Sequence, residues 1–103
     1  MERIMESIIQ KDRSHCFICG MNANLEPLDC HHVWGGGNRK KSEKYGLKVY
    51  IHHNKCHIFG KYSVHLNAEL DRELKTFVQR KAMKHYGWSI EQFREIFGKN
   101  YID

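Results

Sequence analysis

The stretch LDCHHVWGGGNRKK, residues 28–41, decides the fold and the chemistry that this sequence predicts. A short apolar run ends in two adjacent histidines, His31 and His32, and is followed by three glycines and a cluster of Arg and Lys. One imidazole can bind a metal ion while its neighbour accepts a proton, and the cationic cluster can bind a phosphate. The interpretation therefore depends on whether the rest of the chain supplies further metal ligands.

Length and charge limit the classes of protein to consider. A chain of 103 residues predicts one small domain, 1–103, whose limited core a structural metal ion would supplement. The 17 Lys and Arg against 12 Asp and Glu give a net charge of +5. That surplus favours a polyanionic partner, with nucleic acid the first candidate and a generic basic surface the alternative.

Targeting signals are absent from the sequence pattern. No apolar run is long enough to span a membrane, and the first residues begin no apolar signal segment. We therefore expect a cytoplasmic location and no membrane partner.

Four cysteines and eight histidines are the most unusual counts in the chain. In a reducing compartment, cysteines at short spacing hold a metal ion more often than they form disulfides. Cys16 and Cys19 form a C-x2-C pair followed by a glycine, and His53 and Cys56 form an H-x2-C pair. The two pairs together predict a structural zinc site of the Cys3His type.

Alternatives remain open for this zinc site. His52 is a rival to His53 because the ligand turn could shift by one residue, and His57 could also replace His53. Cys30 is a weaker rival, since a lone cysteine is more often a small buried apolar residue. A redox role for the C-x2-C pair would need a thioredoxin-like strand and helix around it, and the sequence shows neither.

The remaining patterns predict an α+β domain. An apolar face indicates a helix over residues 2–11, within an N-terminal segment 1–13. Residues 28–33 and 46–51 are typical of two antiparallel strands, joined by a long polar loop over residues 38–45.

Two helices follow the strands. We expect a core of residues 14–66, which holds the zinc pairs and the strands, and a helical C-terminal part, 67–103. The first helix runs from an N-cap at Asn67 to Tyr86, and the second covers residues 89–97 and begins with a capping box.

Adjacent histidines suit phosphodiester hydrolysis if their roles are divided. The reaction needs an activated water, which a neutral imidazole supplies, and charge neutralisation on the phosphate, which a divalent ion supplies. Because successive residues of a strand point to opposite faces, dividing the roles between His31 and His32 requires the strand to bend at the glycine turn. The alternative is that both histidines belong to a structural zinc site.

These residues resemble a known family. The HHV triplet, a strand returning through Val49, and Cys56-His57 are similar to an HNH endonuclease with the ββα-metal fold. The wider order is more specific. The C-x2-C pair, HHVWGGGNRKKSEKYGL at 31–47, VHLN at 64–67 and IFGKNY at 96–101 together resemble the small HNH proteins encoded by phages and prophages of Gram-positive bacteria.

The resemblance implies a metal-dependent DNA endonuclease that nicks or cuts DNA. It implies that His31, His57 and His65 are ligands of a catalytic divalent ion, which could be Mg²⁺, Mn²⁺, Ni²⁺ or Zn²⁺. It also implies that His32 is the general base. In many HNH nucleases the last ligand stands four residues after its partner, where this chain has Lys61.

A middle asparagine of the family orients the loop that carries the base. Strict spacing places Lys48 at that position, so we assign the orienting role to Asn38, with Asn54 as an alternative. The fold implied is α+β, a ββα-metal motif with a zinc knuckle, an N-terminal helix and two C-terminal helices.

A cationic group follows the glycine turn and predicts a surface for the DNA backbone, with a merely solvated loop as the alternative. Its members are Arg39, Lys40, Lys41 and Lys44. The resemblance further implies a bacterial host cell and phage packaging or recombination proteins as partners. The competing function is a zinc-stabilised nucleic-acid-binding or adaptor module with a degenerate nuclease site, and an RNA substrate is a third alternative.

Overall fold

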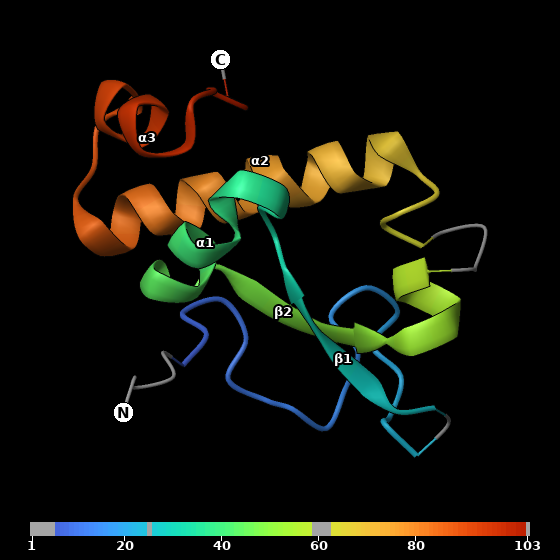
Figure 1. The fold of residues 1–103 in the computed structure, drawn as a ribbon. Coiled ribbons are helices and arrows are strands. Elements are labelled where there is room, and N and C mark those ends of the chain that lie inside the picture. The colour runs from blue at the N-terminus through green and yellow to red at the C-terminus, as the bar shows by residue number, and fades with distance from the viewer. Residues whose placement is uncertain (1–5, 25, 59–62, 103) are drawn as a thin grey trace.

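The computed structural model describes residues 6–24, 26–58 and 63–102. Two strands and three helices make up the fold shown in Figure 1. In chain order these are β1 (Leu28–His32), α1 (Arg39–Tyr45), β2 (Lys48–His52), α2 (Ala68–Tyr86) and α3 (Ile90–Phe97). A short 3₁₀ turn, η1 (Gly36–Asn38), precedes α1, and a π-helical turn, η2 (His53–Ile58), follows β2. The predicted α+β class is confirmed.

The two strands pair in an antiparallel sheet whose register fixes the functional side chains. His31 pairs with Val49, and His32 pairs with Lys48. Because side chains alternate along a strand and paired residues share a face, His31 and Val49 leave one face while His32 and Lys48 leave the other. The sheet therefore separates the two adjacent histidines.

The hydrophobic core joins the first of these faces to the C-terminal helices. Val49 and Ile51 of β2 pack with Leu74 and Val78 of α2, and all four are almost fully buried. Aromatic rings extend the core to α3, where Trp34 lies 5.3 Å from Phe93 and 4.9 Å from Phe97 between ring centroids. In Figure 1, α2 crosses over the hairpin and α3 lies beyond it.

The predicted N-terminal helix is wrong where the structure describes it. Residues 6–13 are not helical, and residues 2–5 of the prediction lie outside the described residues. Ser7 is buried and donates its hydroxyl to the carbonyl of Lys48, while the amides of Ile9 and Gln10 donate to the Ser7 oxygen. Tyr50 donates its amide to the Gln10 side chain. Hydrogen bonds to β2 thus outweigh the local helical pattern.

The predicted loop at 38–45 is also wrong, since Arg39–Tyr45 forms α1. Lys and Glu are good helix formers, and Gly46 ends the helix in the left-handed region with φ +70°. A Cβ at Gly46 would lie 2.5 Å from the carbonyl oxygen of Glu6. Only glycine therefore allows both the helix end and the close approach of the N-terminal segment.

The other predicted elements are confirmed with small shifts at their ends. β1 ends one residue earlier than predicted, at His32, and β2 runs to His52, one residue further. Asn67 caps α2 by accepting the amide of Leu70, and Ser89 caps α3 in the predicted capping box. None of the helices within the described ranges combines the length and the apolar character needed to cross a membrane.

Candidate metal centres

Three cysteines and one histidine converge beneath the hairpin. Their ligand atoms all lie within 4.8 Å of one another, and the members are Cys16, Cys19, His52 and Cys56. We call this set the cysteine cluster. Three thiols and one imidazole at this spacing are the donor set of a structural zinc site, and the four residues could bind a zinc ion.

His52, and not the predicted His53, completes the cysteine cluster. His52 is fully buried, its Nδ1 lies 3.3 Å from the Cys19 sulfur, and its Nε2 lies 3.1 Å from the carbonyl of Asn22. That carbonyl can only accept, so Nε2 carries the proton and Nδ1 is left to bind a metal ion. The correction follows from the end of β2 at His52, because His53 begins η2 and its ring contacts Asp29 instead of the sulfurs.

The thiols of the cysteine cluster are electrostatically coupled. Burial and the neighbouring sulfurs of Cys16 and Cys19 raise the pKa of the Cys56 thiol to about 12. Burial also raises the pKa of Cys16, but backbone amides such as that of Cys19 outweigh it and lower the pKa to about 7. Adjacent thiolates repel one another, so a cation among them would replace the protons and remove the repulsion.

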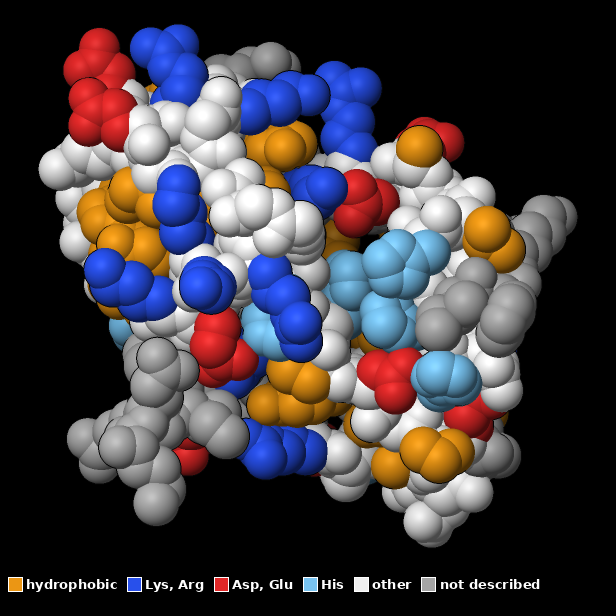
Figure 2. All heavy atoms as spheres, viewed as in Figure 1, with side chains coloured by type: hydrophobic (Ala, Val, Ile, Leu, Met, Phe, Trp, Pro, Cys, Tyr) orange, Lys and Arg blue, Asp and Glu red, His pale blue; other side chains and the backbone are white. Residues whose placement is uncertain are grey.

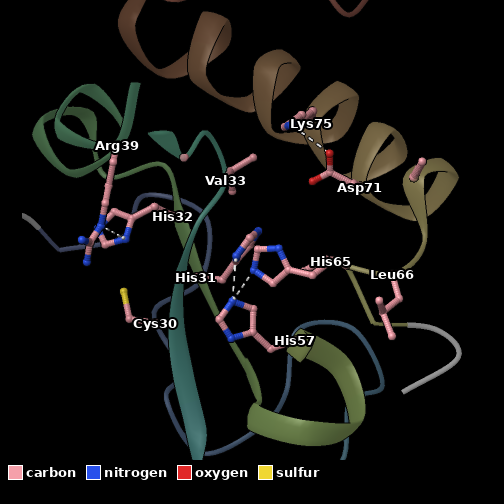
Figure 3. A pocket seen from close by; sticks show the side chains of 13 residues that line it. Cys30, His31, His32, Val33, Arg39, His57, His65, Leu66, Asp71 and Lys75 are labelled. Carbon is pink, nitrogen blue, oxygen red and sulfur yellow. Dashed lines mark hydrogen bonds and ion pairs between the residues drawn. The ribbon is translucent and has the colours of Figure 1, made fainter. Parts of the chain in front are cut away.

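Three histidines form a second cluster on the opposite side of β1. His31 Nδ1 lies 3.3 Å from His57 Nε2, and His65 Nε2 lies 3.0 Å from the same atom. We call His31, His57 and His65 the imidazole cluster; their ring nitrogens also lie within 4.8 Å of one another. Figure 3 shows the three rings pointing toward a common centre. The structure therefore brings together the three histidines that the resemblance implied as ligands of one ion.

His31 is the buried member of the imidazole cluster. It is 7% exposed, and its Nε2 atom has no hydrogen-bond partner among the described residues. Burial, together with the neighbouring imidazoles of His57 and His65, lowers the pKa of His31 to about 3. His31 is thus held neutral, which is the state that can bind a metal ion.

The wide spacing between His57 and His65 is closed by backbone hydrogen bonds. The amide of Val64 donates to the carbonyl of Cys56 at 2.9 Å, and the amide of His65 donates to the carbonyl of His57 at 3.2 Å. Val64 and His65 therefore lie alongside η2, and His65 reaches the imidazole cluster at a spacing of eight residues from His57.

Asp29 contacts the nitrogen of His57 that points away from His31 and His65. Its Oδ2 atom lies 2.9 Å from His57 Nδ1 and 2.5 Å from His53 Nδ1. A carboxylate accepts the Nδ1 proton of His57, so that the Nε2 lone pair faces His31 and His65. Asp29 stands two residues before His31 and shares its strand face, a relation that the sequence contains but that our sequence analysis did not use.

His32 lies outside the imidazole cluster and contacts charged neighbours. Its Nε2 atom is 2.9 Å from Glu43 Oε1, and its Nδ1 atom is 3.5 Å from Nε of Arg39. Glu43 also accepts a hydrogen bond from the ammonium of the buried Lys48, with 2.7 Å between Nζ and Oε2. The sequence pattern indicates no role for Glu43, because it predicts a polar loop over residues 38–45.

One pocket of about 570 Å³ contains both histidines of the pair. It is lined by members of the imidazole cluster, by His32 and Arg39 on one side, and by Asp71 and Lys75 of α2 on the other. Figure 2 shows histidine side chains gathered in a hollow, with Lys and Arg side chains on the adjoining surface. Cys30 also lines the pocket and does not join the cysteine cluster.

Asn38 and the predicted cationic group lie around the glycine turn. Asn38 donates its side-chain amide to the carbonyl of Phe97 at 3.1 Å, so it fastens the turn to α3 and does not line the pocket. Lys41 likewise donates to the carbonyl of Ile96. Lys40 and Lys44 are exposed on α1, and Arg39 is exposed at the pocket.

Comparison of the chain with protein-family models, with curated proteins and with solved structures finds no match.

Proposed function

We propose that this chain is a metal-dependent DNA endonuclease of the HNH type that hydrolyses phosphodiester bonds. The observation that carries the proposal is the convergence of the imidazole cluster at an open pocket that also contains His32. Three imidazoles supply the ligands of a divalent ion and leave coordination positions open. A fourth imidazole outside the cluster supplies a base.

The donor set fits a metal centre of the catalytic kind. A divalent ion held by His31, His57 and His65 would neutralise charge on the phosphate and stabilise the leaving oxygen. Nitrogen ligands suit Zn²⁺ and Ni²⁺ better than Mg²⁺ and Mn²⁺, whose preference is for oxygen. The cysteine cluster would hold a separate structural zinc ion.

In the chemical step, His32 accepts a proton from water. The water oxygen then bonds to phosphorus, and the bond from phosphorus to the sugar oxygen breaks. His31 is less suited to this role, because its one lone pair would bind the metal ion and the residue is buried. Strand alternation sends His31 and His32 to opposite faces of β1, and both residues line the same pocket.

The charge distribution supports DNA as the substrate. The net charge is +5, Arg39 is exposed at the pocket, and Lys40 and Lys44 are exposed on α1. Such side chains contact the phosphate backbone and contribute affinity with little base specificity. We further propose, from the resemblance alone, a bacterial cytoplasm, a phage origin and phage packaging or recombination proteins as partners.

The substitution His32→Ala tests the function. We expect plasmid nicking to fall about 100-fold or more in Mg²⁺, Mn²⁺, Ni²⁺ and Zn²⁺, while DNA affinity and zinc content stay unchanged. The matched control is His85→Ala, which removes an exposed histidine on α2. Undiminished nicking by His32→Ala would remove His32 from the mechanism.

The second candidate is a zinc-stabilised nucleic-acid-binding or adaptor module. The observation that favours it is the pairing of His32 with Glu43 and Arg39, which leaves the base without a free site in this arrangement. A metal count separates the two functions. One tightly held ion per chain with no nicking supports the module, whereas a second ion that a chelator removes together with nicking supports the nuclease. An RNA strand assayed in parallel tests the third alternative.

A further inference from the structure

His32 lies between two groups whose hydrogen-bonding roles are fixed by their chemistry. Glu43 Oε1 is 2.9 Å from Nε2, and Arg39 Nε is 3.5 Å from Nδ1, at the long end of the hydrogen-bond range. An ionised carboxylate can only accept a hydrogen bond, and a guanidinium can only donate one. Both neighbours therefore require the same neutral tautomer, with the proton on Nε2 and the lone pair on Nδ1. Figure 3 shows Arg39 extended along this edge of the ring.

Lys48 keeps Glu43 in the form that this argument requires. Lys48 is 2% exposed, and its ammonium lies 2.7 Å from Glu43 Oε2. Burial raises the pKa of Glu43, but hydrogen bonds from Lys48 and His32 outweigh it and leave the pKa below its ordinary value. A buried ammonium needs a carboxylate partner, so the ion pair holds Glu43 in place as well as ionised.

Strand pairing and α1 bring these three residues together. His32 and Lys48 are directly opposite each other in the sheet, so their side chains leave the same face. Glu43 reaches both from α1, which Gly46 joins closely to β2. The carboxylate therefore spans the strand pair and fixes the orientation of the ring.

We propose that Glu43 is the positioning residue of the general base, and that Nδ1 of His32 is the atom that accepts the proton. The inference rests on the proposed endonuclease function. In the step, an O–H bond of water breaks and the proton goes to Nδ1. The water oxygen bonds to phosphorus, and the sugar oxygen leaves with the electron pair of its broken bond. The Glu43 carboxylate stabilises the imidazolium that forms.

Arg39 has a matching role in this arrangement. In the free protein its guanidinium covers Nδ1. A phosphate competes strongly for a guanidinium, so substrate binding draws Arg39 away and uncovers the base.

The test compares two variants that separate positioning from ion pairing. Lys48→Met removes the buried ammonium but keeps the hydrogen bond from His32 to Glu43. The double variant Glu43→Gln/Lys48→Met removes both charges together, so no buried charge is left without a partner. We expect Lys48→Met, in which Glu43 loses one partner but keeps its contact with His32, to lower kcat for plasmid nicking by about tenfold, and the double variant to lose about 100-fold in kcat with KM nearly unchanged. Glu95→Gln, an exposed change on α3, is the matched control.

The outcomes distinguish this inference from the proposed function. Wild-type kcat in the double variant overturns the inference while leaving the nuclease in place. Equal losses in both variants show a structural ion pair and also overturn it. Circular dichroism and zinc content verify that each variant is folded.

A readout independent of activity is the tautomer of His32. Nitrogen-15 NMR at alkaline pH, with His32→Ala used for assignment, is expected to show a protonated Nε2 and an unprotonated Nδ1 in the wild type. The double variant is expected to show a mixture of tautomers. A proton on Nδ1 in the wild type overturns the inference whether or not the protein nicks DNA, and absent nicking in every metal counts against the proposed function alone.

Discussion

The cysteine cluster and the imidazole cluster each include one of two adjacent residues, but they differ in the number, type and burial of their donor groups. In η2, Cys56 belongs to the first cluster and His57 to the second. The cysteine cluster has four donors, three of them soft sulfurs, and Cys16, His52 and Cys56 are buried. The imidazole cluster has three nitrogens and lines an open pocket. A closed set with four ligands suits structure, and an open set with three suits chemistry.

The difference also makes one cluster dependent on the other. Because Cys56 and His57 are consecutive in η2, whatever holds the thiol of Cys56 also places the ring of His57. Loss of the closed cluster is therefore expected to disorder the open one, whereas loss of the open cluster leaves the closed one intact. The predictions below test this asymmetry.

The largest effect is expected from Cys56→Ser. A structural zinc ion contributes about 10–16 kcal/mol to small zinc domains, and the whole stability of a domain is about 5–15 kcal/mol. Removing a buried ligand should therefore abolish cooperative unfolding at room temperature, with loss of bound zinc and of nicking together. Circular dichroism measures the loss of folded structure, metal analysis the loss of zinc, and the plasmid assay the loss of nicking.

The matched control for Cys56→Ser is Cys30→Ser, because Cys30 is exposed and outside both clusters. It should keep the zinc content and the thermal midpoint of the wild type. A folded, zinc-loaded Cys56→Ser protein would show that the cysteine cluster is not a structural metal site.

The pairs of metal ligands could be predicted from sequence because their spacing is local. The C-x2-C pair and the capping residues of α2 and α3 each depend on a few neighbouring positions, and each feature forms in the structure. The choice between His52 and His53 could not be made in this way. It depends on where β2 ends, and a shift of one residue reverses the side of the sheet on which a histidine lies.

The residues that orient the site depend on contacts across the fold. Glu43 reaches His32 from α1, and the N-terminal segment makes a hydrogen bond from Ser7 to the backbone carbonyl of the buried Lys48. Both elements were mispredicted: residues 39–45 form a helix where a loop was expected, and tertiary hydrogen bonds of Ser7 and Gln10 override the local helical pattern of the N-terminal segment. Local sequence thus predicts the ligands, and the tertiary fold supplies the groups that position them.

An intermediate effect is expected from Asp29→Asn, which acts on the open cluster alone. Asp29 accepts the Nδ1 proton of His57 and makes the opposite nitrogen a better ligand. Loss of the charge should weaken binding of Ni²⁺ or Co²⁺ at the imidazole cluster by about 10–100-fold, with zinc in the cysteine cluster unchanged. Calorimetric titration measures the affinity.

The control is Asp12→Asn, an exposed change beside His15, which should bind Ni²⁺ or Co²⁺ as the wild type does. If Asp29→Asn also binds as the wild type does, Asp29 has no orienting role.

The smallest effect concerns the acid stability of the protein without added metal, to which the buried His31 of the imidazole cluster contributes. Its pKa is lowered from 6.5 to about 3 by burial and by the neighbouring imidazoles, so the unfolded chain binds a proton that the folded chain refuses. The stabilising contribution of neutral His31 is complete above about pH 6.5 and is lost as the pH falls from there toward 3. Over that interval the free energy of unfolding of the wild type should fall by about 1.4 kcal/mol more per pH unit than that of His31→Gln. Urea denaturation at stepped pH measures both slopes. Parallel slopes would mean that His31 takes up its proton within the folded protein, in which case the imidazole cluster is less enclosed on its His31 side than the 7% exposure of that residue indicates.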